Sequence, residues 1–203
     1  MFDLLEELAA IHRSVVRDGR SETVSVALTR TYDADLEDVW DALTNAERLP
    51  RWFSPVTGDL EPGGSYQIEN NAGGDILRCD PPTQLQVTFG SPDSIVDVRL
   101  AHTDGHTTVE LTHTVALALA GSGAGALHVG PGWDGALLAL GTDLDGTPPD
   151  DPVAFANSPE VVEFNRGSID RWTTTIETSG TATPQEVADA REAAVANYTV
   201  VPD

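Results

Sequence analysis

Between residues 55 and about 118, the sequence repeats one pattern: short runs in which apolar and polar side chains alternate. Turn sequences separate these runs, among them NAGG at 71–74 and DG at 104–105. Each run predicts a strand with one apolar face, and connections this short join neighbouring strands into an antiparallel meander. The apolar face of such a sheet must be covered, so the pattern also requires helices from other parts of the chain.

The segment before the meander predicts helices and one more strand. Apolar residues at helical spacing predict a helix over residues 3–16, and residues 22–32 alternate as a strand. Asp35 is a candidate N-cap for a short helix, and Pro50 interrupts a second short helical stretch that follows it.

Three helices are predicted after the meander. The first places Trp133 and Leu137 about one turn apart. The second covers 158–178 and the third about 184–197, each starting at a capping serine or threonine. Helices therefore precede and follow a block of strands instead of alternating with them, which predicts an α+β fold and disfavours a parallel βαβ sheet.

A chain of 203 residues fits one large domain, or one domain with added terminal elements. We expect a helical extension over residues 1–21, a central domain over 22–146, and a C-terminal helical extension over 147–203 that packs on the same domain.

The charge balance limits the possible partners. The chain has 33 acidic and 11 basic residues, all of the latter arginine, for a formal net charge of −22. Nucleic acids and anionic lipids would be repelled, because binding them needs clustered arginine or lysine, so neither partner is expected. Two interpretations of the acidity stay open: adaptation to high salt, and a surface that merely aids solubility.

The cellular compartment is predicted from what the sequence lacks. A single cysteine cannot form an internal disulfide, and the N-terminal residues do not follow the pattern of a signal peptide. No apolar stretch is long enough to suggest a membrane helix. These observations predict a cytoplasmic protein.

Four stretches carry a resemblance to a known family: 30–53, 58–82, 107–114 and 129–141. In this order they resemble the SRPBCC superfamily, also called START-like or helix-grip, and within it the bacterial homologues of the activator of heat-shock-protein-90 ATPase. The resemblance implies a curved antiparallel sheet around a long C-terminal helix, with a cavity between them. It also implies binding of a small hydrophobic or amphipathic molecule. It does not imply a catalytic set, and we expect no cofactor.

The phase of the strands and helices selects candidate ligand-binding residues for this cavity. The sheet offers seven of them, the short helices two and the C-terminal helix two; they are Tyr66, Ile68, Leu77, Phe89, Val98, Leu111 and His113, then Trp52 and Phe53, then Trp133 and Leu137. We expect them to line a buried pocket of roughly 300 Å³ or more.

His113 allows three interpretations. It shares a face with Leu111, so it should point toward the cavity, where it could bind a polar group of the ligand or act as a general base. Alternatively, it is a buried structural histidine bonded to a neighbouring element.

Other chemical motifs are weak. His102 and His106 flank a predicted turn, and a metal site needs three or four converging ligands, so we expect no metal. Cys79 should face inward with Leu77 as a small buried side chain. The glycine-rich stretch 121–126 follows the last strand of a meander, so it predicts a flexible connection rather than a dinucleotide site.

The sequence therefore predicts non-catalytic binding of a small apolar ligand. One alternative is a cavity enzyme of the cyclase, dehydratase or hydrolase type with His113 as base. Another is a protein-interaction module similar to co-chaperones. A protein partner and the choice between monomer and homodimer stay open.

Overall fold

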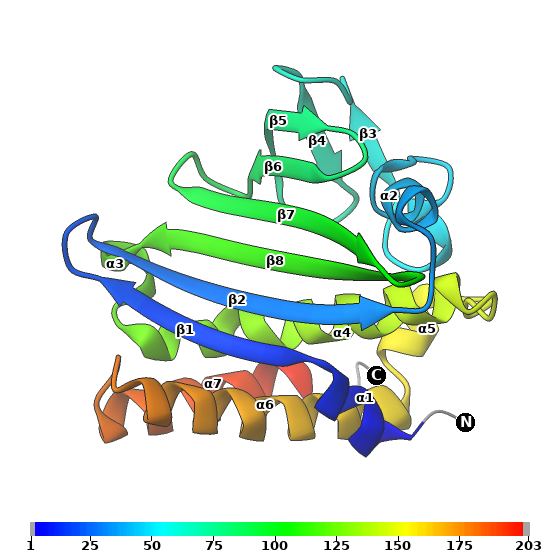
Figure 1. Ribbon diagram of the computed structural model, residues 1–203. Helices are drawn as coiled ribbons and strands as arrows, with labels where there is room; N and C mark the ends of the chain where they lie inside the picture. Colours follow the sequence, from blue (N-terminus) through cyan, green and yellow to red (C-terminus); the bar gives the residue numbers. More distant parts are fainter. Residues whose placement is uncertain (1–2, 201–203) are drawn as a thin grey trace. The chain divides into compact units, whose positions relative to one another are not determined.

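The computed structural model describes residues 3–200 (Figure 1). Its helices are α1 (Leu4–Ala10), α2 (Leu36–Thr44), α3 (Leu117–Ala120), α4 (Ala126–Leu144), α5 (Pro152–Ala156), α6 (Pro159–Ser179) and α7 (Pro184–Tyr198), with the short 3-10 helices η1 (Leu49–Arg51) and η2 (Gly123–Gly125). Its strands are β1 (His12–Asp18), β2 (Thr23–Tyr32), β3 (Val56–Gly58), β4 (Ser65–Ile68), β5 (Gly73–Asp80), β6 (Gln84–Thr88), β7 (Ser94–Thr103) and β8 (His106–Ala116).

The eight strands form one sheet in the order β1-β2-β8-β7-β6-β5-β4-β3. From β3 to β7, each strand pairs antiparallel with the next in sequence, as the short connections predict. The helices lie before, within and after this block of strands instead of alternating with them. The α+β fold class predicted from the sequence is therefore confirmed.

Contacts within the chain divide it into two compact units. Unit 1 combines residues 1–28, 114–138 and 153–203, and unit 2 combines 29–113 and 139–152. Each unit joins segments that are distant in the sequence, and β2, β8 and α4 contribute residues to both. The expected central domain over 22–146 thus stays a prediction, because compactness alone does not establish which segment folds independently.

Unit 1 is built on α6, which contacts β1, α1 and α7. The predicted caps explain where its long helices begin. The Ser158 side chain accepts a hydrogen bond from the Val161 N–H at the start of α6. Thr183 and Glu186 form a reciprocal capping box at the start of α7, with Pro184 at the first helical position.

In unit 2, the strand register separates an apolar face from a polar one. Opposite residues in an antiparallel pair share a face, and Leu85 pairs with Val98 while Gln86 pairs with Asp97. We call one face of β5–β8 the apolar face; it consists of Ile76, Cys79, Leu85, Val87, Phe89, Ser94, Val96, Val98, Leu100, Val109, Leu111 and His113. The other face carries Gln84, Gln86, Asp97 and Arg99 in one hydrogen-bonded group.

The predicted helix over 3–16 is wrong beyond its first half. Helix α1 ends at Ala10, and the following residues form β1. In β1 the inward positions are held by Arg13 and Val15, which are both buried. Arg13 is charged, so the period-2 apolar pattern of the strand is hidden in the sequence.

Leu77 also departs from its predicted phase. The register of β5 against β6 shifts between Ile76 and Arg78, which indicates a β-bulge. The bulge gives the buried position to Ile76, and the Leu77 side chain is 48% exposed. Cys79 keeps its predicted face because it lies beyond the shift, opposite Leu85.

The glycine-rich stretch 121–126 connects α3 to α4, and its flexibility stays a prediction. It forms the 3-10 turn η2, in which the Gly123 N–H donates a hydrogen bond to the Thr181 carbonyl, 3.1 Å away. A side chain at Gly123 would overlap Thr181, so only glycine permits this close approach.

None of the helices among the described residues is long and apolar enough to cross a membrane.

Candidate ligand-binding site

The apolar face of unit 2 contains one buried polar pair. Ser94 begins β7 and His113 lies near the end of β8, and their Oγ and Nε2 atoms are 2.8 Å apart. Both residues are almost inaccessible, at 4% and 3% exposure. Burial lowers the pKa of His113 to about 4, so its imidazole is neutral at pH 7.

Aromatic side chains adjoin this pair. The Phe89 ring contacts His113 edge to face, with ring centroids 5.6 Å apart. The Tyr66 hydroxyl donates to the carbonyl of Thr88, the residue before Phe89, at 2.8 Å. Burial raises the pKa of Tyr66 to about 12, so this phenol also stays uncharged at pH 7.

Part of the apolar face remains accessible. Leu85, Val87, Phe89 and Val98 are half-buried, whereas Val96 and Leu100 on the same face are buried. The accessible residues come from β6, the residue after it and β7, so they are neighbours across paired strands. A molecule contacting them would meet hydrocarbon and one aromatic ring, with the buried Ser94–His113 pair next to that ring.

The short helices of unit 2 carry Trp52 and Phe53. Their rings are 5.5 Å apart, and the Trp52 indole N–H donates to the Ala42 carbonyl in α2 at 3.1 Å. This bond satisfies the indole N–H of Trp52, which is buried just after η1. Helix α2 in turn contacts β7.

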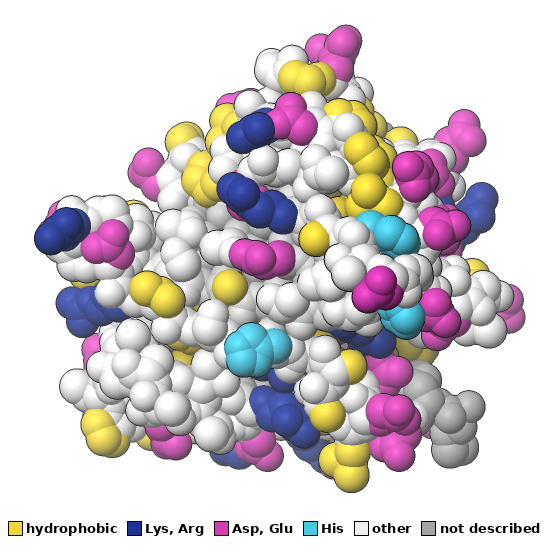
Figure 2. All heavy atoms as spheres, in the orientation of Figure 1, with side chains coloured by type: hydrophobic (Ala, Val, Ile, Leu, Met, Phe, Trp, Pro, Cys, Tyr) yellow, Lys and Arg dark blue, Asp and Glu magenta, His cyan; other side chains and the backbone are white. Residues whose placement is uncertain are grey.

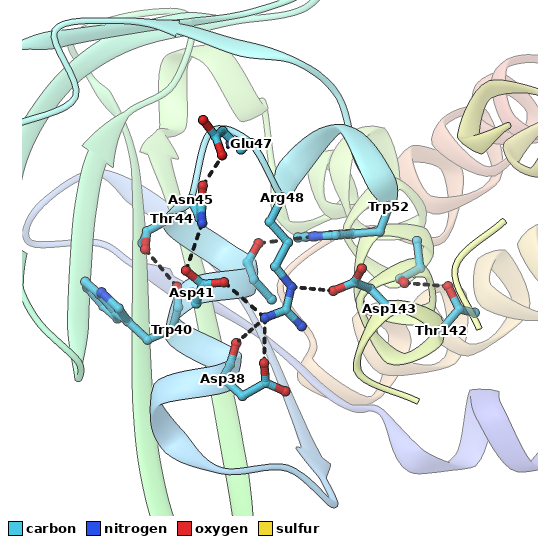
Figure 3. Close-up of polar contacts among 12 residues, drawn as sticks. Asp38, Trp40, Asp41, Thr44, Asn45, Glu47, Arg48, Trp52, Thr142 and Asp143 are labelled. Atoms are coloured by element: carbon cyan, nitrogen blue, oxygen red, sulfur yellow. Dashed lines mark hydrogen bonds and ion pairs between the residues drawn. The ribbon is translucent and has the colours of Figure 1, made fainter. Parts of the chain in front are cut away.

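Arg48 ties these helices to the end of α4 (Figure 3). Its Nε donates to Asp143 at 2.7 Å, and its Nη1 donates to Asp38 at 2.5 Å and to Asp41 at 3.2 Å. Burial opposes the charge of the guanidinium, but the hydrogen bonds to the three aspartates outweigh it and raise the pKa of Arg48. Asn45 donates to Asp41 and extends the group. All of these partners are engaged with one another, so the cluster fixes the position of α2 and η1.

The structure distributes the predicted ligand residues between the two units. Phe89 and His113 are in contact, and so are Trp52 and Phe53. Leu77 leaves the apolar face, as described above. The others are the half-buried Tyr66, Val98 and Trp133 and the buried Ile68, Leu111 and Leu137. Trp133 and Leu137 belong to unit 1, and their role in a pocket stays a prediction.

Sequence reasoning missed Ser94 and the buried cluster of unit 1. Ser94 follows a proline-containing turn, where serine is common, so its pairing with His113 left no signal. In unit 1, Asp134 of α4 is fully buried and accepts hydrogen bonds from Arg13 Nε at 2.9 Å, from Trp172 at 3.1 Å and from the Ser168 hydroxyl. Burial raises the pKa of Asp134, and its three donors partly offset this.

No group of three or more potential metal ligands occurs among residues 3–200. His102 instead lies 3.0 Å from the Thr107 hydroxyl, and His106 lies 3.0 Å from the carbonyl of Asp104.

On the face of the molecule in Figure 2, acidic side chains are scattered with arginines among them and do not gather into one patch.

Comparisons with known proteins bear on this fold. The family model described as Activator of Hsp90 ATPase homolog 1-like protein matches residues 33–141. The crystal structure of CalU16 from Micromonospora echinospora is 31% identical with a TM-score of 0.66, covering 83% of this chain and 99% of CalU16. Its solution NMR structure gives 32% identity and a TM-score of 0.70, covering 84% of this chain and 97% of CalU16.

DynU16, a protein of the dynemicin biosynthetic locus, is 20% identical with a TM-score of 0.55, covering 61% of this chain and 48% of DynU16, and shows similarity of fold alone. None of the curated proteins is significantly similar to this chain. The family match spans more than half of the chain and CalU16 matches almost throughout. The chain therefore belongs to the family of proteins like the activator of Hsp90 ATPase homolog 1, and it has the helix-grip fold of a ligand-binding superfamily.

Proposed function

We propose that this protein binds a small, largely apolar molecule against the apolar face of β5–β8 and does not transform it. The observation that carries the proposal is the partial accessibility of Leu85, Val87, Phe89 and Val98 on a face whose other side chains, apart from the half-buried Cys79, are buried. Ligand pockets are lined mainly by apolar and aromatic side chains with a few polar groups, and this face has that composition.

The protonation of His113 supports binding over catalysis. A general base works best with a pKa near the working pH, and burial holds the pKa of His113 at about 4. Cys79 is a poor nucleophile because the pKa of its thiol is raised, chiefly by burial and to a lesser extent by the charge of Asp80. The cavity-enzyme alternative would need another base.

Matched substitutions on the two faces of β7 test this function. Val98→Phe would fill space on the apolar face, whereas Ile95→Phe adds the same ring on the opposite face. Binding is followed by the fluorescence of Nile red, an apolar dye. We expect Val98→Phe to weaken dye binding roughly tenfold or more, because overpacking at a contact costs about 1–3 kcal/mol.

The Ile95→Phe variant should bind Nile red like the unmodified protein, and the thermal unfolding of both variants controls for stability. A protein that does not bind the dye at all, or that binds it equally well with Phe at position 98, would refute the proposed function.

A further inference from the structure

The polar pair on the apolar face is unusual for its surroundings. Ser94 and His113 bring a hydroxyl and an imidazole into a face otherwise made of hydrocarbon, one thiol and one phenyl ring. Burying polar groups costs free energy, and their mutual hydrogen bond only partly recovers it. Phe89, which touches His113, is half-buried, so the pair lies beside the accessible part of the face.

We infer that Ser94, held by His113, is the hydrogen-bonding contact for one uncharged oxygen group of the ligand, a hydroxyl or a carbonyl, and that the site rejects carboxylates. This inference rests on the proposed function and specifies the ligand class for the same face.

The hydroxyl of Ser94 can serve either oxygen group. A serine hydroxyl has one proton and two acceptor lone pairs, and its bond to His113 Nε2 uses only one of these. If Nε2 carries the ring proton, the hydroxyl remains free to donate to a carbonyl. If Nε2 is the acceptor, the serine oxygen still accepts from a ligand hydroxyl. His113 thus orients Ser94 without consuming its capacity.

Anions are disfavoured beside Ser94 because its hydrogen-bond partner His113 carries no charge. His113 and Tyr66 are both uncharged at pH 7, as their pKa values of about 4 and about 12 require. A carboxylate brought there would lose its hydration without gaining a counter-ion. The formal net charge of −22 repels anions in addition.

Arg30 on β2 is the cation that could weaken this argument. Its guanidinium lies 4.9 Å above the Tyr32 ring, and the neighbouring Thr31 hydroxyl bonds Thr108 on β8 at 2.9 Å. Thr108 is five residues from His113 along β8, which corresponds to about 17 Å in a strand. Thr108 lies near the start of β8 and His113 near its end, so the Arg30 guanidinium over the Tyr32 ring lies toward the opposite end of β8 from Ser94.

Three probes with the same ring system test the inference at pH 7: naphthalene, 2-naphthol and 2-naphthoate, each competing with Nile red. We expect 2-naphthol to bind about fivefold more tightly than naphthalene, the usual gain from one neutral hydrogen bond. We expect 2-naphthoate to bind the most weakly, by about tenfold or more relative to 2-naphthol, because its charge is unpaired.

Ser94→Ala should abolish the preference for 2-naphthol over naphthalene, and Ser94→Thr, which keeps a hydroxyl, should retain it. Ser25→Ala is the matched control, since it removes a hydroxyl bonded at 2.7 Å to Thr114 on the polar side of the sheet, and it should leave the preference unchanged. Equal binding of naphthalene and 2-naphthol, a preference that survives Ser94→Ala, or tightest binding of 2-naphthoate would overturn the inference while Nile red still binds. Failure of Nile red itself to bind would instead refute the proposed function.

Discussion

The two units bury polar groups in opposite ways. In unit 1, Arg13 and Asp134 form an ion pair whose side chains are 3% and 0% exposed, and Ser168 and Trp172 donate to the same carboxylate. In unit 2, Ser94 and His113 form a neutral pair with one hydrogen bond between them and half-buried apolar residues beside them.

Under the proposed function, the difference separates a structural role from a binding role. The ion pair joins β1, α4 and α6, three elements distant in sequence, and its carboxylate is completely buried. The close approach of these elements also explains Gly130, where a side chain would overlap the Trp172 indole. The neutral pair joins the neighbouring strands β7 and β8, and Ser94 keeps hydrogen-bonding capacity. Under the proposed function, a ligand uses the second arrangement and not the first.

The largest expected effect comes from breaking the ion pair of unit 1. Asp134→Ala leaves Arg13 charged, buried and unpaired, which should lower the free energy of unfolding by about 3–5 kcal/mol. Asp170→Ala in α6 removes an exposed ion pair with Arg191 and should cost at most about 1 kcal/mol. Denaturant unfolding measures both. Equal losses would mean that the buried pair is not the tie between these elements.

The next effect concerns the neutral pair and depends on pH. The pKa of His113 is about 4 in the folded protein and near 6.5 when unfolded, so the unfolded state takes up the proton first as pH falls. Stability present above pH 6.5 should therefore be lost between pH 6.5 and about 4, by on the order of 3 kcal/mol.

His113→Gln cannot show this loss, so the stability difference between the two proteins at pH 7 should shrink toward pH 4. Acidic residues that titrate in both proteins cancel in this comparison. A difference that is constant with pH would show that His113 is not neutral and buried as described.

The smallest effect concerns the Arg48 cluster, in which some of the acidic partners are exposed and one is buried. Its partners Asp38 and Asp41 are half exposed, but the Asp143 side chain is only 3% exposed. Arg48→Met should cost about 1.5–3 kcal/mol, chiefly from the unpaired Asp143. Arg78→Met, which breaks an exposed pair with Asp80, should change stability by less than about 1 kcal/mol. Chemical denaturation would contradict this account if Arg78→Met were the more harmful change.

Local signals in the sequence predicted much of the fold. The caps Ser158 and Thr183 marked helix starts, because the bonds they make lie within three residues along the chain. Alternation predicted the shared face of Leu111 and His113 for the same reason. Asp35 occupies its predicted N-cap position, although its side chain makes no capping hydrogen bond.

The errors and omissions depend on contacts that are distant in the sequence. Arg13 conceals β1 because its partner Asp134 is 121 residues away. The bulge that exposes Leu77 is visible only in the pairing of β5 with β6. Ser94 and His113 are 19 residues apart, and nothing in either local sequence predicts their hydrogen bond. Alternation thus predicted that Phe89 and Val98 share an apolar face, but not the hydrogen bond between Ser94 and His113 on that face.

Methyl-resolved NMR during a naphthalene titration tests most directly whether the apolar face binds ligands. Val98 and Leu111 lie on that face, whereas Ile95 of β7 lies on the opposite one and serves as the internal reference. The account predicts that the methyl signals of Val98 and Leu111 shift in a saturable way and that those of Ile95 do not. Signals that stay fixed at Val98 and Leu111, or shift equally at Ile95, would contradict it.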